Sequence, residues 1–348
     1  MHKIPTENFY AFVIPNSKNH GAQNFFQRLY DNFDSQNKFL LIEEDSSFLG
    51  NFLHLSNLTK NKNLKLITTV NSNKLGLIFK IFHPKIDLIA RLGNTVSQEI
   101  KKLSLKFFIH KCFYFFLILF SRKIIFQSEI MKRDFIDFFN FRNMNNKFHI
   151  IHNGVDVAQN NFTSEKKFFK LIDSSKINFL LVGSFKYQKG YDIFFNSIDL
   201  LDQAILDKTH FHICGEGEQF QDFQGLLNDS EYKRFITLYG EVEPAEFYNE
   251  CDVYILPSRF EGFSNSLIEA LSYGLPAIVA ECPSANKEVV KENFNGVFFF
   301  NEDHIDLSKK ITYMIKNHAQ FNKPLIREDI NNRFSINTIA SIYKNLFI

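Results

Sequence analysis

The sequence predicts an α/β protein of two domains, each built around a parallel β-sheet. Three observations carry this prediction. The chain has 348 residues, which is long for a single core and suits two domains. Short apolar runs alternate with stretches long enough for helices, and this scheme occurs twice along the chain. Several runs end in Gly or Pro, as expected where a strand turns into a loop.

The predicted strands form two groups. In the first half the apolar, β-rich runs are Tyr10–Pro15, Phe39–Ile42, Leu66–Val70, Leu88–Ala90, Ile124–Gln127 and His149–His152. In the second half they are Asn178–Gly183, Phe211–Gly215, Ile236–Gly240, Val253–Pro257, Ala277–Ala280 and Val297–Phe299. Because helical stretches separate most of these runs, each group is expected to form one parallel sheet.

A polar, charged stretch, Gln159–Lys176, lies between the halves and is predicted to connect the domains. The predicted domains are therefore 1–165 and 166–330. In the remaining segment, 331–348, apolar residues recur at helical spacing. This segment is expected to be a terminal amphipathic helix that needs a surface to pack on.

The composition excludes several classes of protein. The formal net charge of +2 gives no indication of a nucleic-acid partner. The 43 Phe residues and the absence of Trp predict that Phe fills many core positions. The cysteines are far apart, and three of them lie in apolar stretches, so we expect a reducing compartment without a disulfide framework or a zinc site. They are Cys112, Cys214, Cys251 and Cys282.

The N-terminal residues lack the charged start and the apolar run of a signal peptide, so a cytoplasmic protein is expected. The most apolar segment, Leu103–Phe120, is interrupted by Lys and His, and its unbroken part is far shorter than the ~20 residues of a membrane span. The wider segment 101–123 permits two interpretations. It could be an amphipathic helix at the anionic inner face of a membrane, or a Phe-rich core helix.

The most informative stretch is Pro257–Pro276, PSRFEGFSNSLIEALSYGLP. It contains a strand end, a Gly-containing loop and the start of a helix. Ser264 or Asn265 is expected to cap this helix, so the backbone N–H groups around 263–266 would point at the loop without helical partners. Free donors at the positive end of a helix form an anion site.

Two carboxylates accompany this helix start. Glu261 lies in the loop, and Glu269 follows eight positions later within the helix. Both can accept the hydrogen bonds that sugar hydroxyls donate, while the helix end would hold phosphates. The alternative is that both are ordinary solvated charges near a helix start. The flanking pattern favours a sugar-phosphate site.

The segment from Pro257 to Val290 resembles the donor-binding signature of glycosyltransferase family 4, retaining enzymes of the GT-B fold. Further stretches match the family's motifs in order: HGAQNFFQRL (20–29), IIFQSEIMKRD (124–134), FHIIHNGVD (148–156), VGSFKYQKG (182–190) and FHICGEG (211–217). The resemblance implies two Rossmann-like domains with parallel sheets facing across a central cleft. The first domain would bind the acceptor and the second the nucleotide sugar, with the terminal helix packing back toward the first.

The resemblance also implies residue roles. Glu261 would meet the hydroxyls of the donor sugar, Lys189 the diphosphate, where it offsets charge on the leaving group, and Glu269 the ribose. The other expected donor-binding residues are Gly183, Ser184, Lys186, Gly215, Gly217, Gly262, Phe263, Ser264 and Asn265. In the first domain Gly21, Arg91 and Asn94 would lie at the cleft. Taken without the resemblance, Lys189 could be a surface residue at a helix start and Gly21 part of an ordinary turn.

The sequence departs from the family pattern at three places. Ser184 stands where many members have Arg, and Lys186 is a candidate replacement. His20 replaces the first Gly of the loop before the first helix. The His often found at the first-domain cleft wall is absent, so no acid/base is assigned there. The sequence contains no D-x-D motif, and we expect neither a catalytic metal nor a cofactor.

The resemblance implies a hexosyltransferase. It would move a hexose or N-acetylhexosamine from a UDP-sugar, with retention, to a glycan or lipid-linked glycan in the synthesis of a polysaccharide, lipopolysaccharide or glycoconjugate. Two alternatives remain open. One is a nucleotide-sugar epimerase of GT-B shape, and the other is a catalytically silent scaffold that binds sugar nucleotides.

Overall fold

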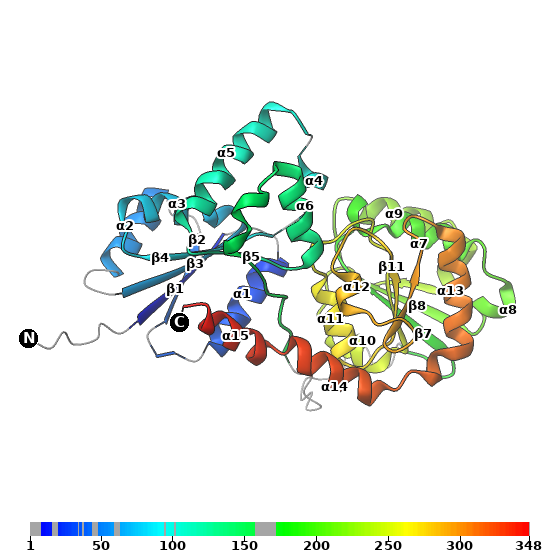
Figure 1. Cartoon of the computed structure of the whole chain (residues 1–348). Coiled ribbons are helices and arrows are strands. Elements are labelled where there is room, and N and C mark those ends of the chain that lie inside the picture. Colours follow the sequence, from blue (N-terminus) through cyan, green and yellow to red (C-terminus); the bar gives the residue numbers. More distant parts are fainter. Residues whose placement is uncertain are drawn as a thin grey trace, which may run out of the picture. The chain divides into compact units, whose positions relative to one another are not determined.

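The computed structural model describes residues 8–15, 20–33, 35–36, 38–43, 48–58, 63–93, 95–100, 102–156 and 172–347. The chain forms two compact units (Figure 1). Unit 1 comprises the chain up to Gly154 together with Phe334–Ile348, and unit 2 comprises Val155–Arg333. The predicted boundary between 165 and 166 lies outside the described residues.

Unit 1 contains a six-stranded parallel sheet with the strand order β2-β1-β3-β4-β5-β6. Its strands are β1 (Asn8–Pro15), β2 (Lys38–Glu43), β3 (Asn63–Thr69), β4 (Asp87–Arg91), β5 (Lys123–Phe126) and β6 (Phe148–Ile150). Its helices are α1 (His20–Asn32), α2 (Phe48–Leu58), η1 (Val70–Ser72), α3 (Asn73–Phe82), α4 (Val96–Glu99), α5 (Leu105–Phe120), α6 (Glu129–Phe139), η2 (Arg142–Lys147) and α15 (Ile336–Asn345).

Alternating side chains of β1 enter two different cores. Phe12 and Ile14 pack with residues of α1 and α15, whereas Ala11 and Val13 pack with residues of α2, α3, α5 and α6. Successive side chains of a strand point to opposite faces. The sheet is therefore covered by α1 and α15 on one face and by α2, α3, α5 and α6 on the opposite face (Figure 1).

Phe fills both cores of unit 1, as the composition predicts. Around Phe135, the rings of Phe126, Phe139 and Phe148 lie with centroids between 5.2 and 5.9 Å away. Most of these pairs are edge-to-face, the arrangement that aromatic quadrupoles favour. The terminal segment forms α15, whose Tyr343 is fully buried in the core that it shares with α1.

Unit 2 contains a second six-stranded parallel sheet with the order β12-β11-β10-β7-β8-β9. Its strands are β7 (Ile177–Val182), β8 (Thr209–Cys214), β9 (Ile236–Leu238), β10 (Val253–Leu256), β11 (Ala277–Ala280) and β12 (Gly296–Phe299). Its helices are η4 (Tyr187–Lys189), α7 (Tyr191–Ile198), α8 (Gln203–Leu206), α9 (Phe220–Asn228), η5 (Glu231–Arg234), α10 (Ala245–Glu250), α11 (Asn265–Ser272), α12 (Asn286–Val289), α13 (His304–Asn317), η6 (His318–Gln320) and α14 (Lys323–Phe334), which leads into unit 1.

The strand order of unit 2 reverses direction at β7. The chain runs from β7 to β8 and β9 on one side and then returns to pair β10 with the other side of β7. In parallel sheets, ligands bind beside the carboxyl ends of the strands at such a switch point. Every predicted strand overlaps one of β1–β12, so the prediction of two parallel-sheet α/β units is confirmed.

Two further expectations can be compared with the structure. Cys214, Cys251 and Cys282 are buried, Cys112 is exposed, and all four are free thiols. Among the described helices, none is both long enough and apolar enough to cross a membrane.

Two histidines of β8, half-buried His210 and buried His212, predict how the stability of unit 2 depends on pH. Burial lowers the pKa of His212 from 6.5 to about 3 and that of His210 to about 4. His212 contacts the Tyr239 hydroxyl at 2.9 Å and the Asn178 Oδ1 at 3.0 Å, so the neutral ring is fully satisfied. Below pH 6.5 the unfolded state therefore binds protons that the folded state does not.

We expect the melting temperature of unit 2 to fall as the pH decreases from about 6.5 to about 4, with His210 and His212 contributing. Because Gln does not titrate, His212→Gln should flatten this dependence. Calorimetric melting from pH 7.5 to 4 measures it. An identical slope for the wild type and His212→Gln would contradict the assignment.

Candidate functional site

The loops that follow β7 and β10 pack against each other at the switch point of unit 2. The Arg259 N–H donates to the Gln188 carbonyl at 2.8 Å. Gly190, which lies between η4 and α7, has a φ of +66°. A Cβ added to Gly190 would lie 2.2 Å from the carbonyl oxygen of Pro257. Only glycine fits both the conformation and the space, so this close approach fixes one loop against the other.

The two residues predicted to be catalytic form an ion pair between these loops. Lys189 Nζ lies 2.6 Å from Glu261 Oε1. The Glu261 side chain is 7% exposed and that of Lys189 is 20% exposed. A buried carboxylate is costly unless it is paired and hydrogen-bonded. The contact therefore explains how Glu261 can remain inside the loop.

Neutral donors complete the coordination of the Glu261 carboxylate. The Ser258 hydroxyl donates to Oε1 at 2.8 Å, and the Gln188 amide donates to Oε2 at 3.3 Å. Gln188 also donates to the Phe260 carbonyl at 3.0 Å. Both carboxylate oxygens are thus accounted for by residues of the two loops. The carboxylate is held in one place with a cation beside it.

Arg259 anchors the β10 loop from its other side. Its guanidinium forms a bidentate contact with Asp192 of α7, at 2.8 and 2.6 Å, and a third contact with Glu302 at 3.1 Å. It also lies over the Tyr187 ring, 4.1 Å from the ring centroid. Hydrogen bonding to Arg259 lowers the pKa of Asp192. Bidentate Arg–carboxylate pairs are geometrically specific, so Arg259 fixes the loop that carries Glu261.

Helix α11 begins where the sequence predicts. Ser264 is its N-cap, with the side chain accepting the Leu267 N–H at 3.4 Å, and Asn265 is its first residue. The Tyr254 hydroxyl donates to Ser266 at 2.8 Å and approaches the Val182 carbonyl at 3.3 Å. These contacts tie the start of α11 to β7 and β10. The amino end of α11 thus lies at the carboxyl edge of the sheet, where it can favour an anion.

Other predicted donor-binding residues surround this edge. Glu269 lies within α11, and its Oε2 accepts the Tyr248 hydroxyl at 3.3 Å. Gly262 and Phe263 lie between Glu261 and the N-cap, and the Gly262 carbonyl accepts the Ala285 N–H. Ser184 is half-buried and Lys186 is exposed on the β7 loop.

The β8 loop contributes two predicted glycines. A Cβ at Gly215 would lie 2.0 Å from the Gly183 carbonyl oxygen, and a Cβ at Gly217 would lie 2.7 Å from backbone atoms of Phe185. The Phe185 N–H donates to the Glu216 carbonyl at 2.9 Å. The β7 and β8 loops are thus joined backbone to backbone, which leaves no room for side chains at Gly215 and Gly217.

The predicted first-domain residues belong to unit 1. Arg91 ends β4 and is only 1% exposed. Its guanidinium contacts the side chain of Asn153 and lies 4.6 Å from the centroid of the Phe25 ring. Burial lowers its pKa. The Arg91 guanidinium therefore links β4 to α1 and to the segment that contains Asn153, all within unit 1.

Of the other two expected cleft residues of unit 1, the structure describes Gly21. Gly21 is the second residue of α1, so the helix begins at His20 instead of after a loop that contains Gly21. Asn94 lies outside the described residues.

Four residues of the site were not foreseen in the sequence: Ser258, Gln188, Arg259 and Asp192. Ser258 precedes Glu261 by three positions and Gln188 precedes Lys189 directly, so proximity to a predicted residue was the available signal. The Arg259–Asp192 pair spans 67 positions and carries no local signal. Within the described part of the chain, no group of three or more His, Cys, Asp or Glu side chains could hold a metal ion.

The arrangement suits a ligand that carries both an anion and hydroxyl groups. Lys189 and the amino end of α11 provide positive potential, and Glu261 provides acceptor oxygens. These groups lie on loops that are held by Gly190, Ser258 and Arg259. They do not depend on a disulfide.

Comparison with known proteins places these loops in a known family model. Residues 162–331 match the model of glycosyl transferases group 1. An uncharacterised 41.2 kDa protein from the cps region of Klebsiella pneumoniae is 29% identical over 215 residues, covering 58% of this chain and 56% of that protein. The chain thus spans about half the length of the first curated relatives that it matches.

Two other matches extend over more of the chain. The N,N'-diacetylbacillosaminyl-diphospho-undecaprenol α-1,3-N-acetylgalactosaminyltransferase of Campylobacter jejuni is 26% identical, covering 77% of this chain and 72% of that enzyme. The crystal structure of HepE from Anabaena in complex with UDP superposes with a TM-score of 0.80 at 13% identity, covering 97% of this chain and 99% of that one. This likeness shows the fold, and the predicted GT-B class with two Rossmann-like domains is confirmed.

The contact between the β7 and β10 loops can be tested at glycine positions. Gly190→Ala should destabilise unit 2 by more than about 1 kcal/mol, because Cβ would meet the Pro257 carbonyl at a positive φ. Gly225→Ala is the matched control. Gly225 lies exposed within α9, and a Cβ there meets nothing within 4 Å. This control should stabilise unit 2 by about 0.5–1 kcal/mol. Urea unfolding of both variants measures the difference, and equal stabilities would contradict the close approach.

Proposed function

We propose that the protein is a retaining hexosyltransferase of glycosyltransferase family 4 that uses a UDP-sugar. The observation that carries the proposal is the ion pair between half-buried Lys189 and buried Glu261 at the switch point of unit 2, inside the segment that matches glycosyl transferases group 1. The proposed donor carries a hexose or an N-acetylhexosamine. The proposed acceptor is a glycan or lipid-linked glycan used to build a cell-surface polysaccharide or related glycoconjugate.

In the proposed complex the donor diphosphate approaches Lys189 and the amino end of α11. The Lys189 ammonium is drawn toward the diphosphate. The Glu261 carboxylate then accepts hydrogen bonds from the hydroxyls of the donor sugar. Ser258 and Gln188 keep the carboxylate in place during this exchange. Glu269 of α11 is the proposed partner of the ribose hydroxyls. Phosphate charge is thus balanced by Lys189 and the helix end, without a metal ion.

The proposed reaction breaks the bond between the anomeric carbon and the diphosphate oxygen. The acceptor oxygen forms its bond to the anomeric carbon on the same face, and its proton passes to the departing phosphate. Negative charge grows on the leaving UDP. Lys189 stabilises that charge more in the transition state than in the bound donor, which is the requirement for acceleration.

The comparisons support the proposed donor and acceptor classes. HepE was crystallised with UDP, and the Campylobacter enzyme is by name an N-acetylgalactosaminyltransferase with a lipid diphosphate acceptor. The likeness to HepE covers nearly the whole chain. A UDP-sugar donor and a lipid-linked acceptor are therefore proposed here too.

Replacing the ion pair tests the catalytic roles. Glu261→Gln and Lys189→Met should each reduce the rate of sugar transfer by about 100-fold or more, because each removes a charge that faces the reacting groups. Steady-state transfer with an established donor measures this effect. Wild-type turnover in both variants would remove the assigned roles.

Folding controls accompany this experiment. Lys189→Met leaves the buried Glu261 carboxylate without its cation, so it should lower the melting temperature, and the double variant Lys189→Met/Glu261→Gln should recover part of the loss. Lys233→Met and Glu231→Gln, both on η5, are charge-matched controls that should retain wild-type rates.

Donor binding separates the proposal from its alternatives. UDP at about 100 times its dissociation constant should stabilise the protein by about 2.7 kcal/mol in thermal melting. Incubation with a UDP-sugar alone should leave the sugar unchanged. A new sugar formed without acceptor would favour the epimerase, and a donor that binds without any transfer would favour the silent scaffold.

We further propose that α5 contacts an anionic membrane at its cytoplasmic face. The segment 101–123 exposes seven large apolar side chains: Leu103, Leu105, Phe108, Ile109, Phe115, Phe116 and Leu119. Exposed apolar residues also occur on α2 (Phe48, Leu49, Leu53) and α3 (Ile78, Ile81, Phe82).

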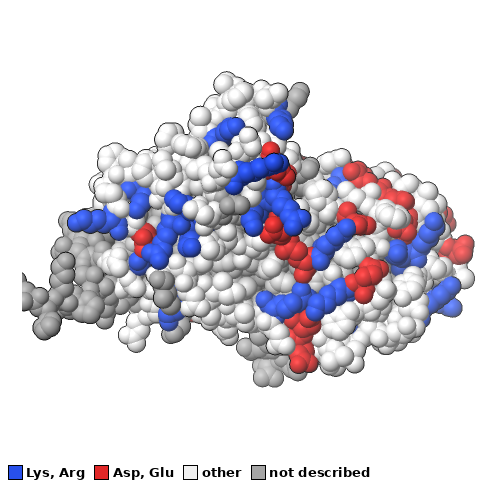
Figure 2. Space-filling view, viewed as in Figure 1, with Lys and Arg blue, Asp and Glu red and all other residues white. Residues whose placement is uncertain are grey.

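The sequences of α2, α3 and α5 contain no Asp or Glu, while Lys74, Lys106 and Lys111 lie on α3 and α5. In Figure 2 the visible surface over α5 is white and blue. Apolar side chains flanked by lysines match an interface of acyl chains and anionic headgroups. This favours the surface-helix interpretation of 101–123.

Vesicle flotation tests the membrane contact. The wild type should float with vesicles that contain anionic lipid, and Phe108→Ser/Phe116→Ser should reduce the bound fraction several-fold, because each exposed ring contributes apolar area. Leu226→Ser, at an exposed apolar position of α9 in unit 2, is the control. Absence of binding by the wild type would end this proposal.

A further inference from the structure

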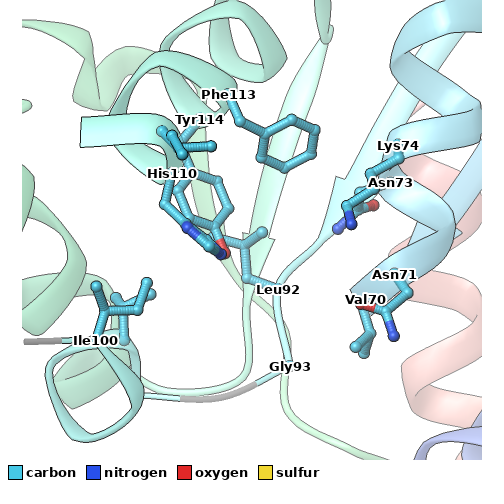
Figure 3. A pocket seen from close by; sticks show the side chains of 12 residues that line it. Val70, Asn71, Asn73, Lys74, Leu92, Gly93, Ile100, His110, Phe113 and Tyr114 are labelled. Atoms are coloured by element: carbon cyan, nitrogen blue, oxygen red, sulfur yellow. The ribbon is translucent and has the colours of Figure 1, made fainter. Parts of the chain in front are cut away.

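Unit 1 contains a cavity of about 310 Å³ that none of the roles above uses. It lies at the carboxyl edge of the unit 1 sheet, between the segment that follows β3 and helix α5. Figure 3 shows Val70, Asn71 and Lys74 on one side, His110, Phe113 and Tyr114 on the other, and Gly93 below them. The volume is that of a small-ligand site.

The rim of the cavity contains a residue with a strained backbone conformation. Val70 has a φ of +48°, which is rare for a β-branched residue and costs energy. A Cβ at Gly93 would lie 2.8 Å from Val70 Cγ2, so the β4 loop passes close beneath this residue. Strained positions of this kind persist only where the surrounding structure holds them, and they cluster at ligand sites.

Buried polar side chains hold the strained rim. Ser72 Oγ donates to the Val13 carbonyl at 2.8 Å and accepts the Thr69 N–H at 3.0 Å. The Gln127 amide donates to the Leu92 and Gly93 carbonyls at 3.1 and 2.8 Å. The rim is therefore fixed by specific hydrogen bonds from the interior.

His110 presents a defined nitrogen at the cavity. Its Nδ1 lies 2.8 Å from the Lys106 carbonyl oxygen. A carbonyl only accepts, so Nδ1 carries the hydrogen, and in the neutral ring Nε2 carries the lone pair. Nε2 can thus accept a hydrogen bond from a ligand hydroxyl. The ring lies beside Tyr114, with centroids 6.2 Å apart.

Lys74 supplies the positive charge of the cavity. It is exposed at the start of α3, and neither α3 nor α5 contains an acidic residue to neutralise it. The adjacent Asn73 is buried and donates to the Arg91 carbonyl at 3.0 Å, which fixes the first turn of α3. The Lys74 ammonium is thus attached to a fixed helical turn, beside the polar and aromatic side chains that line the cavity.

We propose that this cavity binds a sugar phosphate, which would be the reducing end of the acceptor. The inference rests on the proposed function for its link to sugar transfer. Lys74 would contact the phosphate, His110 Nε2 a sugar hydroxyl, and Phe113 and Tyr114 the apolar face of the sugar ring. Ile109 lines the cavity and belongs to the exposed apolar face of α5, where a lipid chain on the phosphate would continue.

Binding of two probes tests the proposal in the absence of any UDP-sugar. The probes are N-acetylglucosamine 1-phosphate and farnesyl-diphospho-N-acetylglucosamine, and isothermal titration measures their affinities. Both probes should bind the wild type. Lys74→Gln removes the charge-assisted contact with the phosphate, and His110→Gln removes the ring nitrogen that accepts from a sugar hydroxyl. Each variant should therefore weaken binding by about tenfold. Lys85→Gln, at an exposed position between α3 and β4 that does not line the cavity, is the matched control and should bind like the wild type.

The outcomes are distinct. At least tenfold tighter binding of the farnesyl probe identifies the ligand as lipid-linked, and equal affinities identify a free sugar phosphate. No binding of either probe, or binding that His110→Gln and Lys74→Gln leave unchanged, overturns the cavity proposal. UDP is titrated in parallel, because its proposed site lies in unit 2. If the wild type does not bind UDP, the proposed donor site is overturned, and the result for the cavity in unit 1 stands separately.

Discussion

The site of unit 2 depends on the burial of one carboxylate. Glu261 sits in a loop with 7% of its side chain exposed, and an isolated charge in that position would cost several kcal/mol. Lys189 offsets this cost only if the β7 and β10 loops meet, and they meet because Gly190 lets the backbone pass against Pro257. Gly190, the Lys189–Glu261 ion pair and the contact between the two loops therefore depend on one another. In the proposed complex a diphosphate replaces Glu261 as the partner of Lys189.

Much of the fold follows from short-range sequence patterns. The apolar runs identify all the strands, because strands buried on both faces need continuous apolar residues. Ser264 was one of two residues foreseen as the cap of α11, because the preferences at helix starts are local. The resemblance placed Glu261 and Lys189 in one site, and the structure brings their charged atoms together.

Other features depend on contacts between distant segments, which no local pattern records. Asp192 and Arg259 become partners only when α7 packs beside the β10 loop. Arg91 was expected at a cleft wall, but it is enclosed by α1 and by Asn153, and its sequence neighbourhood gives no sign of that burial. The cavity with His110 is hidden for the same reason, since α3, the β4 loop and α5 form it jointly.

Phe residues are buried on one face of unit 1 and partly exposed on the other. The Phe residues of α1 fill a core shared with α15, whereas several Phe residues of α5 remain exposed beside lysines. Composition alone gave the same expectation for both helices. The difference arises because α5 is covered on one side only, and its outer face has no partner within the described part of unit 1.

The central claim is that the loops around Lys189 and Glu261 form one ligand site. Hydrogen–deuterium exchange with and without saturating UDP tests it most directly, because ligand contacts slow the opening of the backbone segments that make them. We expect added protection in the peptides that cover 183–190 and 261–268, with little change at α13. Protection confined to other segments, with these two unchanged at saturation, would contradict it.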